Sequence, residues 1–347
     1  MNKFVIKLSI LILVFPFLNL FFTVISDIDS TDKNKEITIS DIFEAGTTGK
    51  FQLIENYFER KFPLRNWLIQ KYNYFVWFVL DSSPKRRVVK GNDNWIFVFL
   101  GNNGLGGRDS SFDEKEFWEY RHGLDRINNF CVKNHIHFYT AVVPEKFNIY
   151  SEYLKPQHNA TIKRDKYFRI YADTVLNLRK TVFFHKELFE AKAENQVYYK
   201  TDTHWNNKGA FLASKKLISV INRDFPSVPN LSERDFDVFY RESAGKDLGD
   251  FLSLSKYLKD EEYIYIPKKR ISDRVNKLKI LVIHDSYFYS MKPFFDLSFS
   301  QVDSFNFVQN ENVEPLIELL KNKPDIVLFV TLERHIGDYD RRIYKIF

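Results

Sequence analysis

Short, almost uninterrupted apolar runs alternate with helical patterns through most of this chain, and this alternation constrains its fold more than any other feature. The apolar runs are Ile136–Val143, Thr181–Phe184, Ile280–Ile283, Ser304–Val308 and Ile326–Val330. The helical patterns between them are Phe112–Asn134, Lys166–Arg179, Asn207–Ile221 and Glu314–Asn322. Strands that are apolar on both faces are typical of a parallel sheet buried between helices. The sequence therefore predicts an α/β fold whose parallel sheet is covered by helices on both faces.

The N-terminal region predicts a membrane anchor. Lys3 and Lys7 precede an uncharged apolar run, Leu8–Ile25, which is long enough for one transmembrane helix. Lysines before such a run favour a cytoplasmic N-terminus and a translocated remainder. The bulky segment Phe22–Ile25 lacks a small-x-small cleavage site, so an uncleaved signal anchor is favoured over a cleaved signal peptide.

The pattern divides the chain into a membrane anchor, a linking region and a folded domain. These regions are residues 1–26, residues 27–87 (a tether and helices) and residues 88–347. The helical pattern of the linking region, Ile39–Val79, is broken at Pro63. In the folded domain, Val88–Leu100 predicts a β-hairpin, and a polar insertion at about residues 230–272 interrupts the alternation of strands and helices.

Composition excludes several functional classes. The net charge is +6, but basic and acidic residues are interspersed without a basic stripe, so we predict no nucleic-acid binding. The only cysteine, Cys131, rules out a disulfide framework and is expected to be a buried core residue. The histidines lack metal-ligand spacing, and the glycine-rich segment Gly101–Gly107 lacks the lysine of a phosphate loop. We therefore predict neither a metal nor a cofactor.

Two segments carry the residue types of a nucleophilic site. Thr201–Asn206 comes directly before a predicted helix, and His284–Tyr287 directly follows a predicted strand. Ligands of parallel α/β sheets bind at the carboxyl ends of the strands. Ser286, at a strand-to-helix turn, can project its hydroxyl into a cleft while backbone N–H groups face a developing oxyanion.

A serine nucleophile needs a base, and the first segment supplies one together with its carboxylate. His204 lies two residues after Asp202, so one short turn can provide both the base and the acid that orients it. Alternatively, Asp202 caps the following helix, His204 is a core histidine and Ser286 is an ordinary turn residue. Their joint occurrence at one sheet edge favours the catalytic interpretation. His284 competes for the base role, and the Asp-x-His setting favours His204.

These segments resemble the SGNH hydrolase-like acetyltransferases of bacterial exopolysaccharide systems, the alginate O-acetyltransferase family. Asp202-Thr203-His204-Trp205 resembles the Asp-x-His-Trp motif of that family. His284-Asp285-Ser286 stands where many relatives have Gly-Asp-Ser or Gly-Thr-Ser. Weaker resemblances lie at Gly91–Phe97, Val143–Lys146, Tyr150–Leu154 and Leu332–Arg334, so the resemblance runs from about residue 40 to residue 335.

The resemblance implies an SGNH-like domain and a role for each matched residue. Ser286 would be the nucleophile that holds the acetyl group, with its backbone N–H as an oxyanion donor. His204 would act as general base and then as general acid, and Asp202 would orient it.

Three further residues are candidates for contacting the substrate: Arg334, Trp205 and Tyr287. For Arg334 the rival prediction is an ion pair with Glu333 or Asp338.

The implied function is O-acetylation of a secreted or cell-surface polysaccharide through an acetyl-serine intermediate. A membrane-bound O-acyltransferase would supply the acetyl group. The predicted location is the inner membrane, with a single N-terminal helix and a periplasmic catalytic domain. Two alternatives stay open: a carbohydrate acetylesterase with the same triad, and a non-catalytic glycan-binding or scaffold protein.

Overall fold

A computed structural model divides the described residues between two compact units. The described residues are 39–44, 46–61, 64–98, 114–156, 181–268 and 276–336, with Lys7, Ile10, Val14, Ile343, Ile346 and Phe347. One unit is Met1–Lys85 with Gly249–Ser255, and the other is Arg86–Leu248 with Lys256–Phe347.

The first unit is helical. Its helices are α2 (Ile39–Glu44), α3 (Thr47–Lys61), α4 (Arg65–Tyr74) and the π-helical turn η1 (Phe75–Val79). The ends of α3 and α4 confirm the predicted break, although Pro63 itself lies outside the described residues. Trp77 is fully buried, and Asn73 Nδ2 donates to the Leu252 carbonyl at 2.7 Å, which ties segment 249–255 to these helices.

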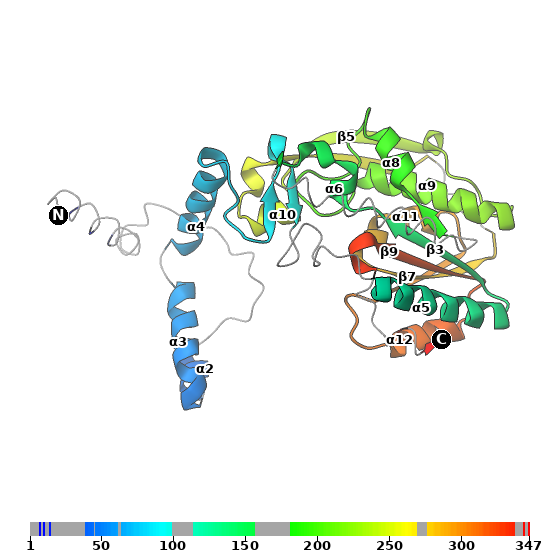
Figure 1. Cartoon of the computed structure of the whole chain (residues 1–347), viewed down its shortest axis with the longest axis horizontal. Helices are drawn as coiled ribbons and strands as arrows, with labels where there is room; N and C mark the ends of the chain where they lie inside the picture. Colours follow the sequence, from blue (N-terminus) through cyan, green and yellow to red (C-terminus); the bar gives the residue numbers. More distant parts are fainter. Residues whose placement is uncertain are drawn as a thin grey trace. The chain divides into compact units, whose positions relative to one another are not determined.

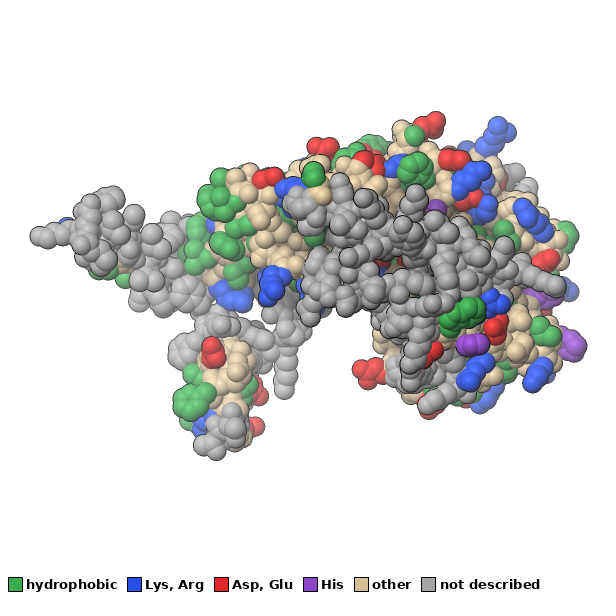
Figure 2. Space-filling view, in the orientation of Figure 1, with side chains coloured by type: hydrophobic (Ala, Val, Ile, Leu, Met, Phe, Trp, Pro, Cys, Tyr) green, Lys and Arg blue, Asp and Glu red, His purple; other side chains and the backbone are tan. Residues whose placement is uncertain are grey.

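Large apolar side chains are exposed on this helical unit. Figure 2 shows hydrophobic side chains gathered over the part of the chain that Figure 1 labels α4. Tyr72 and Val79 are each 61% exposed. Among the described helices, we find none with the length and hydropathy of a transmembrane span. The predicted anchor, Leu8–Ile25, lies outside the described residues apart from Ile10 and Val14.

The second unit is built on a five-stranded parallel sheet, which confirms the predicted fold class. The strands are β3 (His137–Val143), β4 (Thr181–Phe183), β7 (Lys279–His284), β8 (Gln301–Asn306) and β9 (Ile326–Leu332). Their order is β4-β3-β9-β7-β8, and every neighbouring pair is parallel (Figure 1). The carboxyl ends of β3, β9 and β7 therefore meet at one edge of the sheet.

Helices cover both faces of this sheet (Figure 1). The larger ones are α5 (Glu114–Lys133), α8 (His185–Ala191), α9 (Asn207–Asp224) and α12 (Glu314–Lys321). Alternate residues of each strand enter different cores, as the period of a strand requires. Tyr139 belongs to the core that includes α8 and α9, whereas Phe138 belongs to the core that includes α5 and α12. Cys131 is buried in the second core, as predicted, and burial raises the pKa of its thiol to about 12.

Short helices lie between the larger elements. They are α6 (Lys146–Ile149), η3 (Ser151–Tyr153), η5 (Glu233–Asp235), α10 (Asp247–Phe251), η6 (Ser255–Tyr257), η8 (Ser286–Ser290), α11 (Lys292–Asp296) and η9 (Glu333–His335). Three of them, α6, η8 and η9, directly follow β3, β7 and β9. These three turns therefore form the carboxyl edge of the sheet.

The predicted hairpin and the polar insertion are both antiparallel ribbons. The hairpin pairs β1 (Val88–Lys90) with β2 (Ile96–Val98), and its turn holds Asp93 and Asn94 at φ 51° and 61°. Asparagine and aspartate tolerate this left-handed conformation better than other non-glycine residues. The insertion pairs β5 (Phe236–Ala244) with β6 (Lys259–Pro267) over nine residues each. The predicted loop Gly101–Gly107 and helix Lys166–Arg179 lie outside the described residues.

Candidate active site

Three predicted site residues from two distant segments meet at the carboxyl edge of the sheet. His204 Nε2 lies 2.8 Å from Ser286 Oγ, and His204 Nδ1 lies 2.7 Å from Asp202 Oδ1. Because an ionised carboxylate only accepts, Nδ1 carries the proton, and Nε2 is free to accept from the serine hydroxyl. These contacts place a base within reach of a hydroxyl and a carboxylate behind the base, which is the geometry needed to activate a serine.

The segment that carries Asp202 and His204 is stabilised by hydrogen bonds from backbone N–H groups to its side chains. Asn206 caps α9: its Oδ1 accepts from the N–H groups of Lys208 and Gly209 at 3.0 and 3.1 Å. Asp202 is therefore not the helix cap, and its carboxylate instead accepts from the His204 backbone N–H at 3.0 Å. A Cβ at Gly209 would lie 2.3 Å from the Val197 carbonyl oxygen, so only glycine allows this close packing.

The strand-end turn that carries Ser286 is held by Asp285. Asp285 is fully buried, and its carboxylate accepts from the Tyr287 N–H at 3.0 Å and from the Leu332 N–H at 2.6 Å. Asp285 thereby caps η8, whose first residue is Ser286. Within the described part of the chain, the Ser286 backbone N–H has no hydrogen-bond acceptor. It can therefore donate to an oxyanion at the mouth of the turn.

His204 and His284 are the two candidates for the general base, and the structure places them differently. His204 contacts Ser286 Oγ, whereas the His284 ring packs on Phe288 and its Nδ1 lies 2.5 Å from the Asp285 carbonyl oxygen. Burial of His284 lowers its pKa, and the Asp285 carbonyl and carboxylate only partly oppose this. A neutral, buried ring fits the core, so His284 fills space under the turn.

Charged groups around Asp202 favour its ionised form. Burial alone would raise the pKa of Asp202, but hydrogen bonds and charge from His204, together with the charge of Lys146, hold it below its usual value. An ionised Asp202 can fix the His204 tautomer and stabilise the imidazolium that forms when Ser286 loses its proton.

The lowered pKa of Asp202 predicts a pH-dependent contribution to stability. In the unfolded chain this carboxyl titrates near its ordinary value, about 3.9. A folded-state pKa below that value gives stabilisation that is present above about pH 4 and is lost as the pH falls through the folded pKa. Melting temperatures of wild type and Asp202→Asn between pH 2 and 6 would test this. We expect the variant's deficit to shrink toward pH 2, and a constant deficit would contradict the assignment.

Two predicted substrate-contacting residues, Trp205 and Tyr287, have buried side chains with protein partners. Trp205 Nε1 donates to Ser290 Oγ at 2.7 Å, and the Tyr287 hydroxyl donates to the Thr203 carbonyl at 2.5 Å. The Tyr287 ring also packs against His204, with ring centroids 4.8 Å apart. Both side chains therefore join the two catalytic segments to each other. Contact of either with a substrate stays a prediction.

Arg334, the third candidate, forms a buried ion pair. Its guanidinium binds the Glu145 carboxylate in a bidentate manner, with contacts of 2.5 and 2.8 Å, and the two side chains are 10% and 5% exposed. The predicted rival role named an ion pair with Glu333 or Asp338. The partner is instead Glu145, which follows β3. Contact of Arg334 with a substrate also stays a prediction.

The residues on either side of Arg334 also form hydrogen bonds at this edge of the sheet. Glu333 Oε2 accepts from the Glu145 N–H at 2.8 Å and from Asn148 Nδ2 at 2.7 Å, and its Oε1 lies 2.8 Å from His185 Nε2. His335 Nδ1 lies 3.2 Å from Asp285 Oδ2. Burial would raise the pKa of Glu333, but His185 and these hydrogen bonds lower it.

A supporting carboxylate that the sequence did not reveal is Asp260, in the polar insertion. Asp260 is 2% exposed and accepts from the Lys200 N–H at 2.9 Å and from the N–H and hydroxyl of Thr201 at 2.7 and 2.6 Å. The insertion thus anchors the chain immediately before Asp202. Asp260 stands in the charged run Lys259–Glu262, a pattern that is usually solvated, so no local signal in the sequence indicated its burial.

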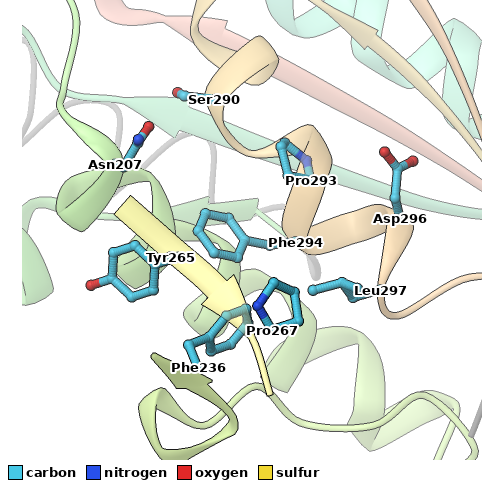
Figure 3. Close-up of a pocket in the computed structure, with 9 residues that line it drawn as sticks. All are labelled: Asn207, Phe236, Tyr265, Pro267, Ser290, Pro293, Phe294, Asp296 and Leu297. Carbon is cyan, nitrogen blue, oxygen red and sulfur yellow. The ribbon is translucent and has the colours of Figure 1, made fainter. Parts of the chain in front are cut away.

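A cavity of about 360 Å³ lies between the insertion, the start of α9 and the turn after β7 (Figure 3). Phe236, Tyr265 and Phe294 form its aromatic wall, and Asn207 and Ser290 lie at its polar end. None of its lining residues belongs to the Ser286, His204 and Asp202 group. The cavity is therefore adjacent to the catalytic segments and is not the place where the serine would react.

One group of described side chains is close enough to share a metal ion. The ligand atoms of Asp202, His204 and Asp247 lie within 4.8 Å of one another. Both ring nitrogens of His204 are already engaged, one by Asp202 and the other by Ser286. A metal ion bound by His204 would have to displace one of these hydrogen bonds, so we interpret Asp202 and His204 as an acid–base pair rather than as metal ligands.

The parallel sheet, with a serine, histidine and aspartate gathered at its carboxyl edge, defines an SGNH hydrolase-like domain. Residues 88–310, more than half of the 347-residue chain, match the family described as "SGNH hydrolase-like domain, acetyltransferase AlgX". The chain belongs to this family, which confirms the resemblance found in the sequence.

Individual relatives are distant. The probable alginate O-acetylase AlgJ of Pseudomonas putida is 25% identical over 213 residues, 58% of this chain and 50% of that protein. Its counterpart in Pseudomonas fluorescens is 26% identical over 235 residues, 65% of this chain and 55% of that protein. The chain thus spans about half the length of the curated relatives it matches.

A solved structure supports the fold. PatB1 of Bacillus cereus superimposes with a TM-score of 0.54 at 17% identity, covering 75% of this chain and 99% of that chain.

Proposed function

We propose that this protein is an O-acetyltransferase that acetylates a secreted or cell-surface polysaccharide through an acetyl-Ser286 intermediate. The observation that carries the proposal is the pair of contacts made by His204, 2.8 Å to Ser286 Oγ and 2.7 Å to Asp202 Oδ1. Membership of the acetyltransferase family and similarity to proteins named alginate O-acetylases support acetyl as the group and a polysaccharide as the acceptor.

In the first step, Ser286 Oγ attacks the carbonyl carbon of an acetyl ester or thioester. His204 Nε2 takes the hydroxyl proton as the Oγ–C bond forms, and Asp202 stabilises the resulting imidazolium. The Ser286 N–H donates to the oxyanion of the tetrahedral intermediate. The bond between the carbonyl carbon and the donor's heteroatom then breaks, and His204 returns its proton to the leaving group. Acetyl-Ser286 remains.

In the second step, a hydroxyl of the acceptor attacks the acetyl carbon. His204 removes the hydroxyl proton, a second tetrahedral intermediate forms, and collapse breaks the bond to Ser286 Oγ. The same proton passes from His204 to Ser286, which restores the starting enzyme. Water in place of the sugar hydroxyl would give acetate, so the acetylesterase alternative differs only in which nucleophile reaches the intermediate first.

Membrane attachment is part of the proposal. The apolar run Leu8–Ile25, with Lys3 and Lys7 before it, would anchor the chain in the inner membrane and leave the catalytic domain in the periplasm. This location would place Ser286 on the side where secreted polysaccharides pass. A membrane-bound O-acyltransferase would then hand acetyl groups to Ser286 across the bilayer.

The acetyl-serine intermediate gives the most direct test. After brief incubation with an activated acetyl ester and acid quench, peptide mass spectrometry is expected to find an acetyl group on Ser286. Adding an acceptor polysaccharide should discharge the adduct and move the label to the polymer. An adduct on any other residue, or none, would refute the mechanism. Acetate release that is unaffected by any acceptor would favour the esterase.

A further inference from the structure

A lysine that the proposed chemistry does not use lies directly beneath the catalytic segment. Lys146 begins α6, just after β3 ends, and its side chain is buried, with the whole residue 3% exposed. Its ammonium group points to the backbone that leads into Asp202. Lysine is among the residues least often buried, so a fully enclosed one requires partners that repay its lost hydration.

The partners are backbone carbonyls of one short segment. Lys146 Nζ donates to the carbonyl oxygens of Tyr199 and Lys200 at 3.0 Å each and to that of Asp202 at 2.6 Å. A protonated amine has three N–H donors, and these three acceptors use them all. Neutral lysine has two donors and a lone pair, so deprotonation would remove one hydrogen bond and set a lone pair against a carbonyl oxygen.

Two aromatic rings also lie close to the ammonium group. The hairpin contributes two aromatic faces, with Nζ 5.5 Å from the Trp95 ring centroid and 5.3 Å from that of Phe97. Both distances are within the range of cation–π attraction.

Charged groups face Lys146 from the other elements packed around it. Asp202 from the catalytic segment, Asp260 from β6 and Glu145 from the start of α6 favour its charge, whereas Arg334 from η9 opposes it. The effect of burial is larger than the combined effect of these charges, and it lowers the pKa of Lys146 to about 7. The charge of this residue therefore changes within the pH range in which an enzyme would work.

We propose that Lys146 is a positioning residue of the catalytic centre, whose ammonium group fixes the backbone of residues 199–202 and thereby the carboxylate of Asp202. The inference rests on the proposed function for its kinetic consequences, but its geometry is independent of the reaction. Asp260 holds the Lys200 and Thr201 N–H groups, and Lys146 holds carbonyls of the same segment. The segment is thus bound through its donors by a carboxylate and through its acceptors by a cation.

Loss of the ammonium group should therefore act on turnover. Asp202 would be free to shift relative to His204, and a displacement of about 1 Å in a catalytic group costs about 100-fold in rate. We expect Lys146→Met, which keeps most of the volume, to lower kcat for an activated acetyl ester by about 100-fold with little change in KM. If Lys146 instead bound the substrate, its loss would raise KM.

The pH profile separates charge from packing. In wild type, kcat should decline above about pH 7 as Lys146 loses its proton. Arginine stays charged throughout this range, so the alkaline decline should be absent in Lys146→Arg, whatever the absolute rate of that variant. Lys192→Met is the matched control. Lys192 also donates to a backbone carbonyl, that of Ile149, and lies 5.4 Å from the Tyr150 ring, but it does not contact segment 199–202.

A spectroscopic readout does not depend on acetyl transfer. The low-field proton resonance of the His204 Nδ1–H bonded to Asp202 should be present in the full-length wild type and in Lys192→Met, and weakened or absent in Lys146→Met. Wild-type kcat and an intact resonance in Lys146→Met would overturn the proposal, as would an alkaline decline unchanged in Lys146→Arg. If Lys146→Met does not fold, the arginine variant decides, and a wild-type profile flat above pH 7 would also overturn it. Failure of the proposed function would show differently, as no acetyl adduct on Ser286 with the resonance intact.

Discussion

Alanine in place of Ser286 is expected to lower kcat for cleavage of an activated acetyl ester by about 10⁶-fold, the loss seen when a triad serine is removed from a hydrolase. In the proposed mechanism the Ser286 hydroxyl both attacks the acetyl donor and then holds the acetyl group, so no other group can replace it. The residual rate would come from substrate binding and oxyanion donors, which Ser286→Ala leaves in place. Initial rates with a chromogenic acetyl ester, measured on folded protein, provide the test.

The matched control is Ser300→Ala, at the residue just before β8. Ser300 is exposed and donates its hydroxyl to the Leu278 carbonyl at 2.7 Å, so its loss should leave kcat within about twofold of wild type. Residual activity of Ser286→Ala within tenfold of wild type would assign the hydrolysis to another nucleophile. If acetylation of polysaccharide in cells also continued at full rate, the non-catalytic alternative would be the better interpretation.

Methionine in place of Arg334 is expected to destabilise the fold by about 3–5 kcal/mol, because it leaves the buried Glu145 carboxylate without its cation. Burial already raises the pKa of Glu145 against the opposing effect of Arg334. Without the arginine, Glu145 will take up a proton on folding over a wider pH range. The loss should therefore be largest near neutral pH and smaller toward pH 4. Urea unfolding at several pH values measures it.

A second substitution isolates the charge. Glu145→Gln removes the uncompensated carboxylate, so Arg334→Met with Glu145→Gln should be more stable than Arg334→Met alone at neutral pH. The opposite order would mean that Arg334 acts mainly by packing. If Arg334→Met were as stable as wild type but had a raised KM for acceptor polysaccharide, the predicted contact of Arg334 with substrate would be favoured.

The sequence predicted the sheet well because each central strand is apolar on both faces. Ile280–Ile283 and Ile326–Val330 are apolar throughout, as strands buried on both faces are, and the carboxyl ends of parallel strands lie at one edge of a sheet. The residues brought together at that edge were found for the same reason. Asp202 and His204 are neighbours in sequence, and Ser286 directly follows a strand, so a local pattern located each of them.

The supporting residues could not be predicted because their partners are distant in sequence. Glu145 and Arg334 are separated by 189 positions, and no local pattern shows that they pair. The polar composition of the insertion does not indicate that it supplies Asp260 to the segment before Asp202. Trp205 has the kind of aromatic side chain that stacks on sugars. Its burial follows from tertiary contacts that the sequence does not show.

The three residues of η9 together contact three separate segments of the chain. Glu333 and Arg334 bind the turn after β3, Glu333 also approaches His185 at the start of α8, and His335 approaches Asp285 beside Ser286. Because consecutive residues serve separate partners, the number of residues after β9 matters as much as their identity. A conservative replacement would weaken the contacts of one residue. A one-residue insertion after Leu332 would instead move all three side chains away from their partners. Homologues that share this architecture should therefore vary in side chain at this turn far more readily than in length.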